Sequence, residues 1–145
     1  MIYELRVIGI PEAAPRPRAF FNKHVGGVRA YTKKTTWSGI FYDHAVKARP
    51  AVMLEGPVDL KVEFLFAKPK SARKGDYWKA TRPDVDNLVK AILDGLTQAG
   101  WWKDDGIVSR CEIVKRFAAS IEAPGANVVV RVMTTGAQPE LREAV

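Results

Sequence analysis

The chain has 145 residues, 47% of them hydrophobic, and carries a formal net charge of +7 with a single cysteine. This length and apolar content suffice for one globular domain over residues 1–145 that needs no metal or disulfide to hold its core together. The single cysteine, Cys111, excludes an intramolecular disulfide. With only two histidines elsewhere in the chain, neither thiol catalysis nor a zinc site is supported. No signal peptide and no apolar run near the ~20 residues of a membrane span are recognised, so we expect a cytosolic protein that is not membrane-bound.

The charge is distributed unevenly along the chain. Residues 1–82 hold 16 Lys/Arg and 7 Asp/Glu, whereas residues 83–145 hold 7 and 9. The basic part attracts a polyanion, while the acidic part would repel a phosphate backbone unless a metal ion lay between them. This distribution favours a nuclease over a protein that only coats DNA.

The amino-terminal segment predicts a strand followed by a loop. Residues 1–10 are rich in strand-forming side chains and stop at Pro11, which predicts a strand. Residues 12–31 contain prolines, glycines and scattered basic side chains such as Arg16, Arg18, Lys23 and Arg29. This composition predicts an irregular exposed loop that could track phosphates.

A helix and a strand are expected next. Residues 35–48 place Trp37 and Phe41 on one helical face, with a threonine available as the cap, and predict a helix. Residues 58–67 alternate cleanly between apolar and polar side chains, which predicts a strand that pairs with the first one. Its polar face is expected to start out solvated and holds Asp59, Lys61 and Glu63.

The segment over residues 68–82 predicts a DNA-contacting loop. It holds six Lys/Arg, one Asp and two aromatic side chains, Tyr77 and Trp78. Aromatic rings stack on unpaired bases and basic side chains bind phosphate, so these residue types together favour DNA over the alternative of a merely solvated loop. The basic residues expected to contact DNA are Lys70, Arg73, Lys74, Lys79 and Arg82.

An amphipathic helix is predicted after this loop. Apolar side chains recur there at helical spacing, at Val85, Leu88, Val89, Ile92, Leu93 and Leu96. The opposite face stacks Asp86, Lys90 and Asp94, and Asp84 lies at the N-cap position. The helix is expected to end, or the chain to turn, at Gly95 and Gly100. Two residues beyond it are expected in the core or at an interface, Trp101 and Trp102.

The acidic residues in and after this helix suggest a metal site. Asp104 and Asp105 precede a strand-like run, and if that strand packs beside the helix, Asp84, Asp86 and Asp105 meet. Each aspartate alone has a structural explanation as a cap, a dipole partner, half of an ion pair worth ~0.3–0.5 kcal/mol, or a turn residue. Three converging carboxylates would repel one another unless a hard cation such as Mg²⁺ lay between them. We therefore expect a Mg²⁺ site.

The carboxy-terminal part completes the predicted fold. Residues 107–118 and 126–134 predict two strands that form a hairpin, and residues 136–145 predict a polar tail that is disordered or peripheral. The order strand, helix, strand, helix, strand, strand is typical of an α+β domain with a single mixed or antiparallel sheet and helices on one face.

One stretch resembles a known family. Its residues are Pro83-Asp84-x-Asp86-Asn87-Leu88-x-Lys90, then Asp94 and Leu96, then Trp102-x-Asp104-Asp105 before a strand. This pattern is similar to that of the RusA family of Holliday junction resolvases.

The resemblance implies a RusA-like homodimer that hydrolyses paired phosphodiesters in four-way junction DNA during recombination and repair. It gives Asp84, Asp86 and Asp105 metal-binding catalytic roles and Lys90 an essential basic role, with Asp104 as a neighbour. Two alternatives stay open from the residues alone. One is a metal-dependent nuclease acting on other branched DNA, and the other is a non-catalytic DNA-binding protein whose aspartates only cap a helix and form a turn.

Overall fold

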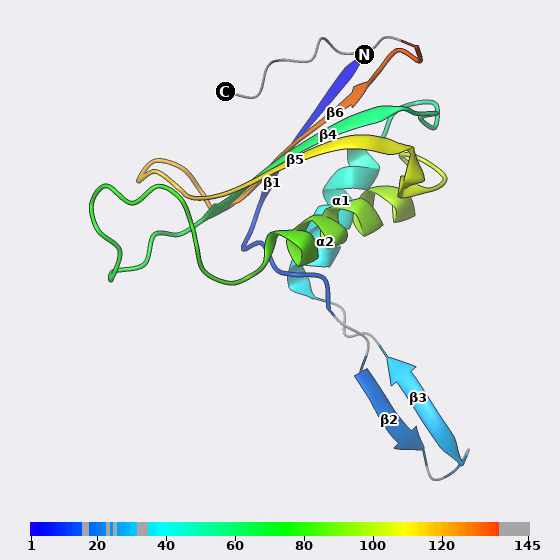
Figure 1. Cartoon of the computed structure of the whole chain (residues 1–145), viewed down its shortest axis with the longest axis horizontal. Helices are drawn as coiled ribbons and strands as arrows, with labels where there is room; N and C mark the ends of the chain where they lie inside the picture. Colours follow the sequence, from blue (N-terminus) through cyan, green and yellow to red (C-terminus); the bar gives the residue numbers. More distant parts are fainter. Residues whose placement is uncertain (16–17, 23, 25, 32–34, 137–145) are drawn as a thin grey trace.

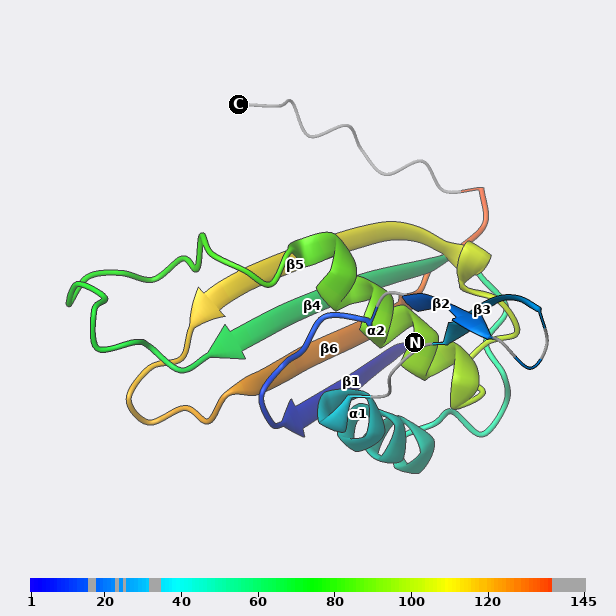
Figure 2. The same cartoon turned by 90° about the horizontal axis from the view of Figure 1, so that it is seen from below.

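The computed structural model describes residues 1–15, 18–22, 24, 26–31 and 35–136, which form a four-stranded sheet, a two-stranded hairpin and two α-helices (Figure 1). In chain order the elements are β1 Ile2–Ile8, β2 Arg18–Asn22, β3 Gly27–Tyr31, α1 Thr36–Lys47, β4 Val58–Phe66, α2 Val85–Gln98, the short 3₁₀ helix η1 Asp105–Ile107, β5 Val108–Phe117 and β6 Gly125–Val132. Both α-helices cover one face of the sheet (Figure 2). The predicted α+β architecture is confirmed.

The order of strands in the sheet differs from the predicted one. The order is β1-β6-β4-β5, so β4 does not pair with β1, and β5 and β6 form no hairpin because β4 lies between them. β4 and β5 are parallel, whereas β6 is antiparallel to both β1 and β4. The α2 helix between β4 and β5 supplies the long crossover that a parallel pair needs. Alternation of side chains defines the faces of a strand but leaves its neighbours open, which explains both errors.

The predicted irregular loop over residues 12–31 is also wrong. It contains an antiparallel hairpin, in which β2 and β3 pair from Arg18 with Tyr31 to Asn22 with Gly27. Gly26 takes a φ of +65° in the connection, a left-handed conformation that glycine adopts without steric cost. Gly26, one of the glycines that suggested an irregular loop, therefore lies in the turn of a hairpin. Arg16 and Lys23 lie outside the described residues, as does the tail over residues 137–145.

The core lies between the sheet and the two helices. Trp37 and Phe41 from α1 are buried there against the sheet, together with three α2 residues, Leu88, Ile92 and Leu96. Trp101 and Trp102 are also fully buried, which confirms the expectation of a core position. The indole Nε1 of Trp101 donates to the carbonyl of Ala45 at 2.8 Å, so the buried ring keeps a polar partner.

The predicted helix end at Gly95 is wrong, whereas Gly100 does stop the chain from continuing the helix. Gly95 lies inside α2, and a Cβ built on it would approach Phe41 Cδ1 to 2.5 Å. The missing side chain lets the two helices approach each other closely. Gly100 has a φ of +84° and follows the C-cap residue Ala99, as is common at helix C-termini.

The open face of the sheet is less solvated than expected. Lys61 is exposed, but Asp59 is buried, with 2% of its surface accessible. Its carboxylate accepts from Arg110 at 2.6 Å and from Arg131 at 3.1 Å, and the hydrogen bond from Arg110 lowers the pKa of Asp59. Two cationic partners thus compensate the burial of this charge. Among the described residues, no helix has the length and apolarity needed to cross a bilayer.

Candidate active site

The first turn of α2 displays two of the predicted site residues. Asp84 occupies the N-cap position with an extended backbone, and its carbonyl accepts from the amide of Leu88 at 3.1 Å, which begins the helical ladder. The carboxylate of Asp84 makes no capping hydrogen bond, and both Asp84 and Asp86 are exposed. Capping therefore does not account for this carboxylate, and the two negative charges lie at the positive end of the helix dipole.

Lys90 lies one turn further along α2, on its exposed face. Its Nζ is 3.2 Å from Oδ2 of Asp94, with 61% and 45% of the two side chains accessible. An exposed i,i+4 pair of this kind contributes only about 0.2–0.5 kcal/mol to helix stability. The ion pair is too weak to hold the ammonium group rigidly, so Lys90 is free to reach a bound anion.

Asp104 and Asp105 come from η1, which contacts α2. Asp105 is half-buried and Asp104 is exposed, and Asp104 makes no capping hydrogen bond although it precedes η1. Within the described part of the chain, none of the carboxylates of Asp84, Asp86, Asp104 and Asp105 has a hydrogen bond or salt bridge. Oxygen donors without structural partners match the chemistry that a divalent cation such as Mg²⁺ requires.

The structure does not bring the predicted metal ligands together as a closed group. Across residues 1–136, apart from the few that are not described, no three Asp, Glu, His or Cys side chains are placed so that they could hold a metal ion. Asp84 and Asp86 share the start of α2, while Asp105 approaches from the neighbouring η1. The donor chemistry of the predicted site is present, but the three carboxylates are not assembled into one site.

Lys115, on β5, holds the segment that leads into Asp84, a role that was not predicted. Its Nζ donates to the carbonyls of Thr81 and Pro83, both at 2.7 Å. The edge of β5 also binds the preceding loop, since the amide of Phe117 donates to the carbonyl of Tyr77 at 2.8 Å. A lysine in a strand pattern usually indicates a solvent-facing position, so this role could not be predicted from the sequence.

The basic loop, residues 68–82, extends beyond the end of the sheet at which β4 ends (Figure 2). Its aromatic residues Tyr77 and Trp78 are 48% and 65% exposed, so their rings are accessible for stacking. Exposed cationic groups without a side-chain partner among the described residues are Lys70, Arg73, Lys74 and Arg82. The loop therefore presents both predicted kinds of DNA-binding group.

Lys79 differs from the other cations of the basic loop. It is half-buried, its Nζ lies 5.1 Å from the ring centre of Phe66 and 5.8 Å from that of Phe117, and it donates to Oγ1 of Thr81 at 2.7 Å. Burial, together with the charge of Lys115, lowers the pKa of Lys79. Its contacts thus anchor the base of the loop to the sheet.

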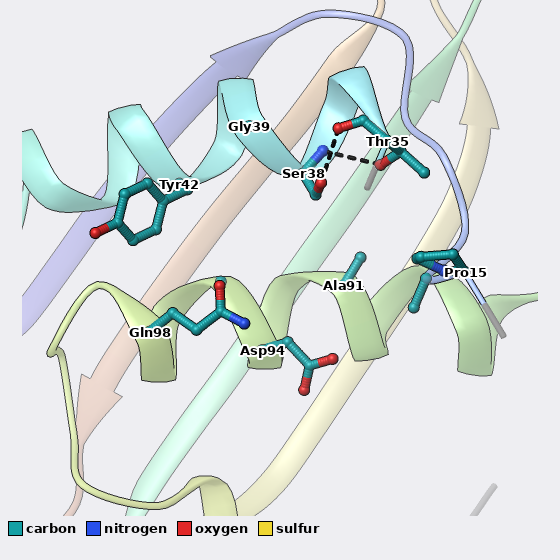
Figure 3. Close-up of a pocket in the computed structure, with 10 residues that line it drawn as sticks. Pro15, Thr35, Ser38, Gly39, Tyr42, Ala91, Asp94 and Gln98 are labelled. Atoms are coloured by element: carbon teal, nitrogen blue, oxygen red, sulfur yellow. Dashed lines mark hydrogen bonds between the residues drawn. The ribbon is translucent and has the colours of Figure 1, made fainter. Parts of the chain in front are cut away.

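A hollow lies elsewhere, between α1 and α2 (Figure 3). It has a volume of about 640 Å³ and is lined by Ala14, Pro15, Thr35, Ser38, Gly39, Tyr42, Ala91, Asp94, Gly95 and Gln98. Asp94 is the one acidic residue in this lining, and none of the three predicted metal ligands reaches it. The exposed carboxylates of Asp84 and Asp86 lie instead directly after the basic loop in the chain.

Comparison with known proteins identifies the family of this chain. Residues 9–131 match the family described as Endodeoxyribonuclease RusA. The chain therefore belongs to the RusA family and is an endodeoxyribonuclease, a hydrolase of DNA phosphodiesters.

Three relatives illustrate the range of similarity. The chain is 30% identical to the uncharacterized protein YqaN of Bacillus subtilis (strain 168) over 135 residues, which are 86% of this chain and 92% of that protein. It is 29% identical over 92 residues to the crossover junction endodeoxyribonuclease rusA of Lactococcus phage r1t, covering 62% of this chain and 70% of the phage protein. Against RusA of Escherichia coli (strain K12) it is 53% identical over 34 residues, 23% of this chain and 28% of that protein.

Proposed function

We propose that this chain is a Mg²⁺-dependent endodeoxyribonuclease that resolves four-way DNA junctions in recombination and repair. The observation that carries the proposal is the pair of exposed carboxylates at Asp84 and Asp86, which have no partners among the described residues and directly follow the basic loop in the chain. Asp105, half-buried on η1 and also without a partner there, is the third carboxylate of the RusA motif. Family membership supports metal-dependent cleavage, and two of the relatives are named crossover junction endodeoxyribonucleases.

The proposed roles follow from the chemistry of each side chain. Asp84, Asp86 and Asp105 would be the ligands of Mg²⁺, which when bound would supply an activated water and stabilise negative charge on the phosphate oxygens. Lys90, about 6 Å along the helix axis from Asp86, neutralises the phosphate at the scissile position. Lys90 would thus act on the charge of the phosphate directly, and the carboxylates would act through the metal ion.

The basic loop binds the DNA that surrounds the scissile phosphate. Lys70, Arg73, Lys74 and Arg82 contact backbone phosphates, and the contacts of Lys79 keep the base of the loop in place. The exposed rings of Tyr77 and Trp78 stack on bases whose faces are accessible at the branch point. Base stacking is interrupted at a branch point and not in continuous duplex, so this contact favours branched DNA.

A homodimer is proposed because resolution of a four-way junction needs two cuts, one in each of two opposed strands. One chain has a single copy of the Asp84, Asp86, Lys90 and Asp105 set. Two chains related by a twofold axis place two such sets on one symmetric substrate. The dimer thus explains paired hydrolysis without a second site in the same chain.

The test is a cleavage panel with equal concentrations of a four-way junction, a three-way junction, a flap and a linear duplex, each with Mg²⁺ and with EDTA. The expected result is Mg²⁺-dependent paired nicking that is fastest on the four-way junction. Faster cleavage of the three-way junction or the flap would favour a nuclease for other branched DNA. Junction binding without nicking in Mg²⁺ would contradict the nuclease assignment and leave a DNA-binding protein.

A further inference from the structure

The hairpin formed by β2 and β3, here called the arm, is a projecting and strongly basic element. It extends away from the sheet on the side covered by the helices (Figure 1). Among the described helices and strands, β2 and β3 pack on each other and make at most marginal contact with any other element. Residues 16–34, which include the arm, contain six Lys/Arg and no Asp or Glu. A segment with this charge and no packing role on its own body is suited to bind a polyanion.

The backbone register of the arm pairs arginines with aromatic residues. Arg18 pairs with Tyr31, and Phe20 pairs with Arg29. Phe21, which pairs with Val28, is 64% exposed. Arginine and aromatic residues together are the residue types that bind phosphates and stack on bases.

The described residues that flank the arm are bound to the helices. Before the arm, the amide of Ala14 donates to the carbonyl of Asn87 in the first turn of α2 at 2.9 Å. After the arm, Oγ1 of Thr35 accepts from the amide of Ser38 at 3.1 Å and caps α1 (Figure 3). The chain therefore passes next to the turn that carries Asp84 and Asp86 shortly before it enters the arm.

The arm and the basic loop lie on opposite sides of the start of α2. In both Figure 1 and Figure 2 this end of the helix falls between the loop over residues 68–82 and the arm. Each strand of the arm has five residues, a length of about 17 Å, which corresponds to about five base pairs of duplex. A two-stranded ribbon also fits the major groove of B-form DNA.

We propose that the arm is a second DNA-binding element, which grips the duplex on the far side of the scissile phosphate from the basic loop. This inference rests on the proposed function and adds a binding surface to it. Arg18 and Arg29 of the arm contact backbone phosphates, and the two elements hold the substrate across the carboxylates at the start of α2.

The experiment compares two double variants with equal loss of charge. Arg18→Ala/Arg29→Ala removes two cations from the arm, and the control Lys47→Ala/Lys61→Ala removes two exposed cations from the body. Affinity for a four-way junction is measured in EDTA at several salt concentrations. The arm variant should bind more weakly, and its slope of log affinity against log salt should fall by about 1.8, at about 0.9 per lost phosphate contact, while the control keeps the wild-type slope.

An unchanged slope in the arm variant, or an equal change in both variants, would overturn the proposal. A third variant, Phe21→Ser, tests whether the arm instead joins two copies of the chain. If this change dissociates the protein in sedimentation while the arginine variant keeps its slope, the arm is a protein contact and the DNA proposal is wrong. Nicking of the junction by the wild type in Mg²⁺ is measured separately. Failure of the arm proposal appears as an unchanged salt slope, whereas failure of the proposed function appears as absence of nicking by the wild type.

Discussion

Lys90 shows how one residue can have a structural and a functional interpretation at once. Its salt bridge with Asp94 is the arrangement expected of any exposed helix face, and it contributes little stability. The proposed function gives the same lysine a second role, which is to neutralise the phosphate at the scissile position. The two interpretations differ in what they require: a helix ion pair needs both partners, whereas phosphate neutralisation needs only the cation.

A pair of variants separates these roles. Lys90→Met and Asp94→Asn both break the salt bridge, and both should shift the free energy of unfolding by less than about 0.5 kcal/mol. Lys90→Met should slow single-turnover cleavage at least about tenfold, because the transition state loses a nearby positive charge, while Asp94→Asn should cleave at nearly the wild-type rate. Equal rates for the two variants would leave Lys90 as an ion-pair partner and nothing more.

Lys79 shows a limit of sequence reasoning at the residue scale. The sequence placed it with the other cations of the basic loop, because composition reports how many charges a segment has. Whether a given lysine points to solvent depends on tertiary neighbours, and here Phe66 and Phe117 from two strands lie against it. The contacts of Lys115 were missed for the same reason, since its partners Thr81 and Pro83 are distant in sequence.

The two helices meet through a glycine, and this contact can be tested at the scale of the element. Gly95→Ala would place a Cβ 2.5 Å from a ring carbon of Phe41, and overpacking of this kind costs about 1–3 kcal/mol. The gain in helix propensity, about 1 kcal/mol, is smaller. Chemical denaturation should therefore show a net loss of stability of about 1 kcal/mol.

The matched control for this change is Gly39→Ala in α1. A Cβ at Gly39 has open space within 4 Å, so only the gain in propensity remains and the variant should be more stable than wild type by up to about 1 kcal/mol. If both alanine variants stabilise the protein, the contact between Gly95 and Phe41 is not tight and the described helix packing is wrong.

The basic loop makes a separate prediction as an element. Replacing Lys70, Arg73 and Lys74 with alanine should weaken junction binding in EDTA and reduce the salt slope by up to about 2.7, for three lost phosphate contacts. Lys79→Ala should instead lower the thermal unfolding temperature, because it removes the contacts with Phe66, Phe117 and Thr81. A triple variant with the wild-type affinity and slope would exclude the loop as a DNA-binding element.

Most individual elements could be predicted from the sequence, whereas their arrangement could not. Helical spacing at Leu88, Ile92 and Leu96 identified α2, and strict alternation identified β4, because these periods reflect burial of one face. Which strands become neighbours depends on the path of the connections, so β6 was wrongly paired with β5. The arm was missed because its strands are short and its glycines and prolines are equally common in loops.

At the scale of the whole molecule, the carboxylates at the start of α2 lie near two basic elements, one directly before them in the chain and one distant in sequence. The start of α2, with Asp84 and Asp86, lies between the basic loop and the arm (Figures 1 and 2). Positive elements on both sides attract DNA, while the carboxylates repel it unless a cation neutralises them. Binding and cleavage should therefore respond in opposite directions when one carboxylate loses its charge.

The residue types of the candidate site were readable from the sequence because their spacing on one helix and before one strand is local. Their assembly was not readable. Asp105 lies on η1, which contacts α2, but the described residues contain no closed group of three metal ligands. Asp84 and Asp86 are kept close by their common helix turn. Assembly of the proposed Mg²⁺ site therefore depends on the position of Asp105.

The most direct test of the central claim is strand cleavage by Asp105→Asn, alongside its junction affinity in EDTA. Asparagine is nearly isosteric and is tolerated in turns, so the variant should fold with wild-type thermal unfolding. Glu55→Gln removes the same charge from an exposed position outside the site and serves as the control. Asp105→Asn should cleave a four-way junction in Mg²⁺ orders of magnitude more slowly than wild type. Its affinity for the junction in EDTA should equal or exceed that of wild type. The Glu55→Gln control should be unchanged in both measurements. Near-normal cleavage by the folded Asp105→Asn protein would contradict the account and remove Asp105 from the active site.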